Sequence, residues 1–316
     1  MKFSKKTLSL IPALILFAVF NVHPLEVDRS ELQTTDTEAV VFENYTGPHA
    51  KIDSLNAIKG IGSSLGKLLA NPAEKSTVGN GQRYYVIHAV DSTVKEKLDA
   101  DILILAENAT VDHITNLRRI ISAYLSAAYN YSEADADTLS VFITVYNAVY
   151  RGKMDVFTGK YKTVVTGNLT QDKAGLALSY TQWPGNSQIV IPLSDPVSGG
   201  LSTVDTSVIS SGDVVSSMRE ETDKGIDARK DMVDIKEKEA VQAAEKARNA
   251  QKTAAEEQKQ LQENQAKLPV AKKEAAEARK EAAANPENEV LQQKAQEKTD
   301  QAKQIEQTIE QNKTNI

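Results

Sequence analysis

The chain has 316 residues, with 37 basic and 43 acidic side chains and a formal net charge of −6. This balance favours neither nucleic acid nor anionic lipid as a partner. Cysteine is absent, which excludes disulfides, Cys-ligated zinc, iron–sulfur clusters and cysteine nucleophiles. The four histidines leave little room for a His-rich metal site, and we expect no metal and no cofactor.

Residues 1–25 have the pattern of a segment that directs export. Three lysines and no acid precede an apolar run from Leu8 to Val22. This order is typical of a signal peptide, whereas the run is shorter than the roughly 20 apolar residues that a membrane span needs. A small-x-small cleavage triplet does not stand before Glu26. We therefore expect either a cleaved signal peptide or an uncleaved N-terminal anchor, and a periplasmic or envelope-associated protein.

The aromatic side chains divide the rest of the chain. All of them lie at or before Trp183, so residues 219–316 contain none. Aromatic residues contribute heavily to globular cores, whereas a stretch rich in Ala, Glu, Lys and Gln is typical of a long exposed helix. We expect a mixed α/β or α+β domain over residues 26–193, a Ser/Thr/Gly-rich linker over 194–217, and a charged, coiled-coil-like helical arm over 218–316.

Hydrophobic spacing predicts interleaved strands and helices within the domain. Thr110 and Ser132 are expected to cap two of the helices, because hydroxyl side chains bind free amides at helix starts. The glycines at Gly60 and Gly62 are expected to break the first helix. In chain order the predicted elements are a strand at 39–42, a helix at 52–69, strands at 84–90 and 101–106, helices at 114–128, 133–150 and 172–180, and a strand at 188–193.

Small apolar residues follow a seven-residue repeat through the arm, but the second position of the repeat is weak. The arm is expected to form a marginal coiled coil, a folded-back hairpin or a single solvated helix. Pro269 and Pro286 are expected to break the helix, which would allow residues 270–284 to pair with 287–312. Unbroken, residues 219–267 would span about 74 Å, which suits a spacer or a docking arm.

Five side chains are the best available ligands in the domain. Arg118, Arg119 and Arg151 are candidates for binding an acidic or phosphate ligand. His88 and Asp91 form a candidate pair of a base and the acid that orients it. For each of them the alternative is surface solvation or internal pairing. The glycines of the first helix lack the spacing of a dinucleotide or phosphate loop. No catalytic site is therefore predicted, and an uncharacterised hydrolase is the alternative.

Several separated blocks of the domain resemble one protein family. The blocks are Glu26-Val27-Asp28, Asn44-Tyr45, Gly60-Ile61-Gly62, Asn116 to Ile120, Tyr146 to Gly152, Ala174-Gly175-Leu176 and Tyr180 to Leu193. In this order they resemble the N-terminal region of the 83/100-kilodalton antigen family of spirochaetes, known from Borrelia and Treponema. The resemblance covers roughly residues 26–193, and the arm resembles that family's charged helical segment in composition.

The resemblance implies an exported envelope protein that is recognised as an antigen and has no established enzymatic activity. We expect a structural or interaction role with a protein partner or envelope component, in which residues 218–316 provide spacing, docking or self-association. The alternative is a periplasmic ligand-binding or hydrolytic domain that the arm tethers. Nucleic acid is not an expected partner. Because family members continue past such a segment, the chain is expected to be a short member or a fragment.

Overall fold

The computed structural model describes residues 39–48, 52–70, 77–80, 83–194, 203–218 and 225–315. The expected export segment at residues 1–25 lies outside this part of the chain. By their internal contacts the described residues form two units, one that ends at Glu239 and one that begins at Ala240. The sequence places the start of the arm at residue 218, so the first turns of its helix belong to the domain unit instead.

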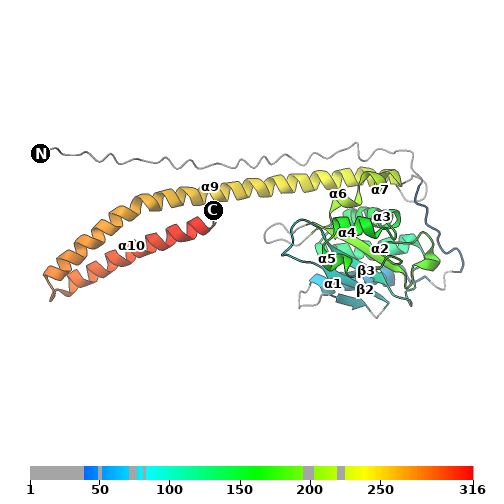
Figure 1. Ribbon diagram of the computed structural model, residues 1–316, viewed down its shortest axis with the longest axis horizontal. Helices are drawn as coiled ribbons and strands as arrows, with labels where there is room; N and C mark the ends of the chain where they lie inside the picture. The colour runs from blue at the N-terminus through cyan, green and yellow to red at the C-terminus, as the bar shows by residue number, and fades with distance from the viewer. Residues whose placement is uncertain are drawn as a thin grey trace. The chain divides into compact units, whose positions relative to one another are not determined.

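The unit that ends at Glu239 contains one sheet and several helices, and the described residues of the other unit are helical (Figure 1). The strands are β1 (Thr77–Asn80), β2 (Tyr84–Ala89), β3 (Asp99–Leu105) and β4 (Ser187–Leu193). The helices are α1 (Leu55–Ala70), α2 (Ile114–Tyr129), α3 (Glu133–Val149), α4 (Met154–Lys160), α5 (Thr163–Thr166), the 3-10 helix η3 (Tyr180–Gln182), α6 (Thr206–Ile209), α7 (Gly212–Ser216), α9 (Gly225–Ala284) and α10 (Glu289–Asn315).

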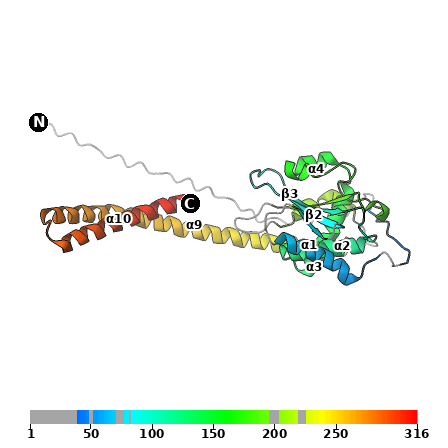
Figure 2. The same cartoon turned by 90° about the horizontal axis from the view of Figure 1, so that it is seen from below.

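The sheet is antiparallel throughout, with the strand order β1-β2-β3-β4. The expected strands at 84–90, 101–106 and 188–193 are confirmed as β2, β3 and β4. Helices α1, α2 and α3 gather on one side of the sheet (Figure 2). Antiparallel pairing with grouped helices is the α+β arrangement, so the mixed class is confirmed and the parallel α/β form is not observed in the described residues.

Helices α1 and α2 approach each other closely because α1 presents glycines at the contact. A Cβ added to Gly62 would lie 2.0 Å from the carbonyl oxygen of Ile120. A Cβ added to Gly66 would lie 2.7 Å from the Cβ of Ala127. The expected break at Gly60 and Gly62 is wrong, since α1 continues through both. The missing side chains allow two helix backbones to touch, and they do not interrupt the helix.

Side chains cap the starts of α2 and α3. Oγ of Ser132 accepts a hydrogen bond of 3.2 Å from the amide of Asp135, so the predicted cap of α3 is confirmed. The cap of α2 is His113, whose Nδ1 accepts a hydrogen bond of 3.2 Å from the amide two residues later. The expected Thr110 cap is wrong, because α2 begins only at Ile114 and the Thr110 hydroxyl instead donates to Asp53 at 3.0 Å.

The helix expected at 172–180 is wrong. The stretch consists of turns beside β4, and the only regular element near it is η3. Gly175 has a φ of +89°, and a Cβ there would lie 2.4 Å from the carbonyl oxygen of Asn147. Its amide donates to the carbonyl of Gln188 at 2.9 Å. The apolar residues whose spacing suggests a helix therefore lie in a loop that packs against the outer edge of β4. Helices α4 and α5 were not predicted.

The side chain of Asn147 closes part of the same edge. Its Oδ1 accepts from the amide of Val190 at 2.7 Å, and its Nδ2 donates to the carbonyl of Val190 at 2.8 Å. A buried strand edge must satisfy its backbone groups. A helix side chain and a loop together do this for β4, so the strand is buried along its whole length.

Residues 203–218 belong to the domain core, so the expected linker at 194–217 is wrong for this stretch. Helices α6 and α7 bury Ile209, Val214 and Val215 completely. The start of α9 adds Ala228, Met232 and Ile235 to the same cluster. Serine and threonine here end or cap short helices, and the scattered valines and isoleucines that resemble a loose edge in sequence are the buried residues.

The strand expected at residues 39–42 does not form. Residues 39–42 belong to no regular element, and the amide of Val40 donates to the carbonyl of Ser217 at 2.9 Å. Phe42 is buried edge-on against Trp183, with ring centroids 6.5 Å apart. The apolar run therefore packs as a strap across the core, which satisfies its side chains without a place in the sheet.

The unit from Ala240 onward is a helical hairpin. Helix α10 lies antiparallel beside the second half of α9 in both views (Figures 1 and 2). Five alanines and one isoleucine form the seam between the helices: Ala275, Ala278, Ala282, Ala295, Ala302 and Ile309 are buried. Ion pairs flank the seam, with Lys298 2.8 Å from Glu274 and Lys272 2.7 Å from Glu306. Of the three expected forms of the arm, the second half of α9 with α10 has the folded-back hairpin, whereas residues 241–260 of α9 are a largely exposed helix.

The two prolines of the arm behave differently. The expected break near Pro286 is confirmed, since α9 ends at Ala284 and α10 begins at Glu289. The expected break at Pro269 is wrong, because α9 continues through it. Pro269 is exposed to solvent. Water can therefore bind the backbone carbonyl that loses its amide partner, and the helix tolerates the proline.

Candidate functional site

The five side chains that the sequence singles out do not converge on one site. His88 lies on β2 and Asp91 follows it in a loop, Arg118 and Arg119 lie on α2, and Arg151 follows α3. The structure therefore does not join them into one binding site. The contacts of each functional group therefore differ, and they indicate a separate role for each side chain.

The predicted pair of His88 and Asp91 does not exist. Nδ1 of His88 lies 2.6 Å from Oδ1 of Asp101, its cross-strand neighbour on β3. The second oxygen of Asp101 accepts hydrogen bonds from the hydroxyls of Tyr124 and Tyr129. Burial alone would lower the pKa of His88, but the hydrogen bond and the charge of Asp101 outweigh it and raise this pKa. The group is a buried carboxylate with three donors, of which His88 and Tyr129 are partly exposed and Tyr124 is buried.

Asp91 is a turn residue. Its Oδ1 accepts hydrogen bonds from the amide and the hydroxyl of Thr93, at 2.9 and 2.6 Å, and these bonds lower the pKa of Asp91. Beside it, Nζ of Lys162 donates to the backbone carbonyl of Asp91 and to Oδ2 of Asp99, both at 2.7 Å. Lys162 and Asp99 each have only 1% of the side chain exposed. This pair is an internal tie between β3 and the loop before α5.

Arg151 is also committed to the fold. Its guanidinium donates to the backbone carbonyls of Asp172, Lys173, Gly175 and Asn186, at 2.5 to 3.2 Å. Five donors on a rigid planar group suit a cluster of carbonyls. Arg151 therefore holds the loop beside β4, and the alternative of internal pairing applies to it.

Arg118 and Arg119 differ from the other three because they line a cavity. The cavity has a volume of about 460 Å³ and lies between α2, α3 and the start of α9. Nε of Arg118 donates to Oγ1 of Thr144 at 3.0 Å, and its guanidinium carbon lies 5.7 Å from the ring centre of Phe42. Nη1 of Arg119 donates to Oδ1 of Asn116 at 2.8 Å. These contacts fix the arginines on the cavity wall.

Sequence reasoning missed the acids of this region. Asp137 of α3 and Asp227 and Asp231 of α9 line the same cavity. Nothing in their local sequence separates them from the other charges of the arm and of the capped helix start. The buried acids Asp99 and Asp101 did carry a signal, because two carboxylates alternate within an otherwise apolar strand.

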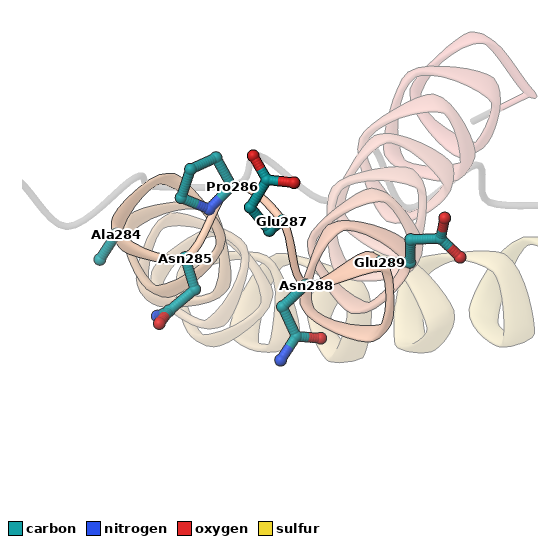
Figure 3. Close-up of a pocket in the computed structure, with 6 residues that line it drawn as sticks. All are labelled: Ala284, Asn285, Pro286, Glu287, Asn288 and Glu289. Atoms are coloured by element: carbon teal, nitrogen blue, oxygen red, sulfur yellow. The ribbon is translucent and has the colours of Figure 1, made fainter.

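A second hollow lies at the turn of the hairpin, where it is lined by residues 284–289 (Figure 3). The labelled side chains point in different directions: Pro286 and Glu287 to one side, Asn285 and Asn288 to the other. Polar groups that do not point at a common centre cannot bind a small molecule cooperatively. The hollow follows from the geometry of the turn.

The described part of the chain contains no group of three His, Asp or Glu side chains placed to hold a metal ion. In that same part, no helix has both the length and the apolar character that crossing a bilayer requires.

The comparison with protein families extends the resemblance seen in the domain. A family described as Borrelia P83/100 protein matches residues 29–316, which includes the helical hairpin as well as the domain. No curated protein and no solved structure matches the chain. Because the family match covers nearly all of the chain, the protein belongs to the Borrelia P83/100 protein family.

Proposed function

We propose that the protein is an exported envelope protein that binds a protein partner or an envelope component, and that the helical hairpin is its docking element. The observation that carries the proposal is that α10 folds back against the second half of α9, so this part of the arm is not a solvated tail. Two helices share an alanine seam there, and their outer faces expose charged side chains. A folded element of this kind offers a fixed pattern of charge to a partner.

Binding is favoured over catalysis by the way the domain uses its charged groups. Asp101, Lys162 and Arg151 all bond to atoms of the domain itself. A catalytic group must be within reach of a substrate, with its protonation set for the reaction. The described charged groups are better explained as parts of the fold.

Export is supported by the sequence of residues 1–25 and by the family. Lysines followed by an apolar run are typical of a segment that the secretion machinery recognises. The absence of cysteine is compatible with either side of the membrane and does not distinguish between them. We propose a periplasmic or envelope-associated location on this basis.

Chemical cross-linking in native envelopes tests the docking role. The full chain is compared with a chain that ends after Glu239, because a cut at residue 218 would remove Ala228, Met232 and Ile235 from the domain core. The fluorescence of Trp183, which is fully buried in the domain, reports whether the shortened chain is folded.

Recovery of a discrete partner with the full chain and its loss with the shortened, folded chain would support the proposal. Partner recovery that survives the truncation would move the binding site to the domain. Cross-links only between copies of this chain, lost on truncation, would make self-association the role of the hairpin. Recovery of no partner and no second copy with the full chain would contradict the proposal.

A further inference from the structure

A hollow on the side of the hairpin is lined by more basic than acidic side chains. It lies between α9 and α10, has a volume of about 270 Å³, and belongs to the unit that begins at Ala240. Lys272 and Arg279 of α9 and Lys303 of α10 line it, and Glu306 is the one acid among its lining residues. The short side chains of three alanines and one threonine complete the lining and leave the space open.

The basic side chains of this hollow are only partly neutralised. Nζ of Lys272 lies 2.7 Å from Oε1 of Glu306. Nε of Arg279 donates to the neutral hydroxyl of Thr299 at 2.9 Å. Among the described residues, neither Arg279 nor Lys303 forms an ion pair. Two of the three positive charges therefore lack a carboxylate partner.

The other flank of the same seam is balanced. Glu274 and Glu281 lie on the side of α9 away from the hollow, because the helix has about 3.6 residues per turn. There Glu274 pairs with Lys298 at 2.8 Å and Glu281 pairs with Lys294 at 3.2 Å. Residues 240–315 as a whole contain 13 basic and 13 acidic residues. The excess of positive charge is thus local to the hollow.

These features fit one small anionic group better than an extended anionic surface. A volume of about 270 Å³ is below the range of about 300–1,000 Å³ for sites that hold a whole small molecule. Anionic membranes attract clusters of about 4–8 basic residues, whereas this flank has three and the hairpin is neutral overall. A guanidinium group binds a carboxylate with two parallel hydrogen bonds. A protein carboxylate therefore has the size, charge and geometry that the hollow requires.

We propose that the hollow binds an acidic segment of the protein partner, with at least two neighbouring aspartate or glutamate residues. One carboxylate binds the guanidinium of Arg279, and a neighbouring one neutralises the ammonium of Lys303. Lys272 keeps its pair with Glu306. This inference rests on the docking role proposed for the hairpin and names the chemistry of the partner surface.

Peptide titration of the full chain tests the chemistry of the hollow. The probes are hexaglutamate and hexaglutamine, both with blocked ends, and vesicles that contain phosphatidylglycerol. Backbone amide NMR signals of residues 275–279 and 299–306 report occupancy. Hexaglutamate should shift these signals and hexaglutamine should not, and added salt should weaken the binding. A response to the vesicles without a response to hexaglutamate would assign the hollow to a membrane surface and overturn the proposal.

Charge-removing variants locate the binding. Arg279→Gln and Lys303→Gln should each weaken hexaglutamate binding about threefold, which is typical of exposed charge pairs. Lys280→Gln is the matched control, since Lys280 is the exposed neighbour on the same helix and does not line the hollow. Circular dichroism at 222 nm checks that the hairpin is folded. An equal loss with Lys280→Gln, or unchanged binding in the double variant of Arg279 and Lys303, would overturn the proposal.

A carbodiimide cross-linker identifies the occupant in native envelopes, because it joins a lysine amine directly to a carboxylate in contact with it. With the full chain, Lys303 should be linked to an aspartate or glutamate of another protein, and Arg279→Gln should reduce this link. A link to a second copy of the chain would overturn the proposal. Recovery of a partner without a link at Lys303 would overturn it and leave the docking role intact. Recovery of no partner would contradict the docking role, and this proposal with it.

Discussion

The domain and the hairpin reach stable structure by different means. The domain buries Trp183, several tyrosines and a lysine–aspartate pair, and it brings helix backbones into contact at glycines. The hairpin joins two helices through an alanine seam, with ion pairs that remain partly exposed. Each contact in the domain is therefore specific and costly to change. The hairpin distributes its stability over many small contributions, which leaves its charged surface free to vary with a partner.

Two spectroscopic signals report separately on the unfolding of the domain and of the hairpin. The chain has one tryptophan, Trp183, and it lies in the domain, so fluorescence during unfolding in urea reports the domain alone. Circular dichroism at 222 nm is dominated by α9 and α10, which are the longest helices of the described residues.

The largest expected effect is from Lys162→Met. The change leaves the buried carboxylate of Asp99 without its cation, and breaking a buried ion pair in this way costs about 3–5 kcal/mol. The free energy of unfolding measured by Trp183 fluorescence should fall by this amount. Removing both charges in Lys162→Met with Asp99→Leu should recover most of the loss. A single variant as stable as the wild type would show that the pair is not buried in solution.

Gly62→Ala should destabilise the domain by about 3 kcal/mol, near the upper end of the range for overpacked cores. The added methyl meets the carbonyl of Ile120, so α1 and α2 must separate. Gly60→Ala is the control on the same helix, where a Cβ meets nothing within 4 Å. It should stabilise the domain by about 0.5–1 kcal/mol through helix propensity. Equal effects of the two changes would contradict the close approach of the helices.

The glycines show where the sequence was ambiguous. A glycine that interrupts a helix and a glycine that admits a neighbouring helix look the same in a single sequence, because both positions only require that no side chain is present. The position of α2 decides between them, and residues distant along the chain set that position. The same holds for Gly175, where the carbonyl of Asn147 excludes a side chain.

Short sequence patterns predicted the elements whose structure depends on residues close together in the chain. The strands β2, β3 and β4, the Ser132 cap and the turn at Pro286 follow from alternation, capping and proline chemistry. The cavity could not be predicted, because only the packing of α2 and α9 brings Arg119 and Asp231 to the walls of one cavity. Asp101 was missed as the partner of His88 for a similar reason, since the strand register joins them.

Ala282→Glu tests the alanine seam of the hairpin. The carboxylate would enter a position with only 3% exposure, and we expect a loss of about 2 kcal/mol, confined to the circular dichroism transition. Ala283→Glu is the matched control, because the neighbouring side chain is exposed. The Trp183 transition should be unchanged in both variants. A loss of helical signal that is the same in both would contradict the seam.

His88→Asn should destabilise the domain by about 1.5 kcal/mol at pH 6, where it removes a charge-assisted hydrogen bond to Asp101. Because Asp101 raises the pKa of His88, the histidine contributes fully below its unfolded pKa of about 6.5. This contribution is lost as the pH rises through the folded pKa. The difference between wild type and variant, measured by urea unfolding, should therefore shrink from pH 6 to pH 9. A difference that grows with pH would contradict the assignment.

The smallest effect is expected from Lys298→Gln. The pair of Lys298 and Glu274 is partly exposed, with 36% and 49% of the side chains accessible. Such pairs contribute about 0.2–1 kcal/mol and weaken with salt. The midpoint of thermal unfolding by circular dichroism should shift slightly at low salt and not at high salt. A shift as large as that of Ala282→Glu would show that ion pairs, not the alanine seam, hold the hairpin.

The most direct test of the docking role uses point variants in the full chain. Envelope cross-linking is repeated with Ala282→Glu, which opens the seam, and with Ala283→Glu, which adds the same charge at the surface of the same turn. If the folded hairpin is the docking element, the partner should be recovered with Ala283→Glu and lost with Ala282→Glu. Recovery of the partner with both variants would contradict the account.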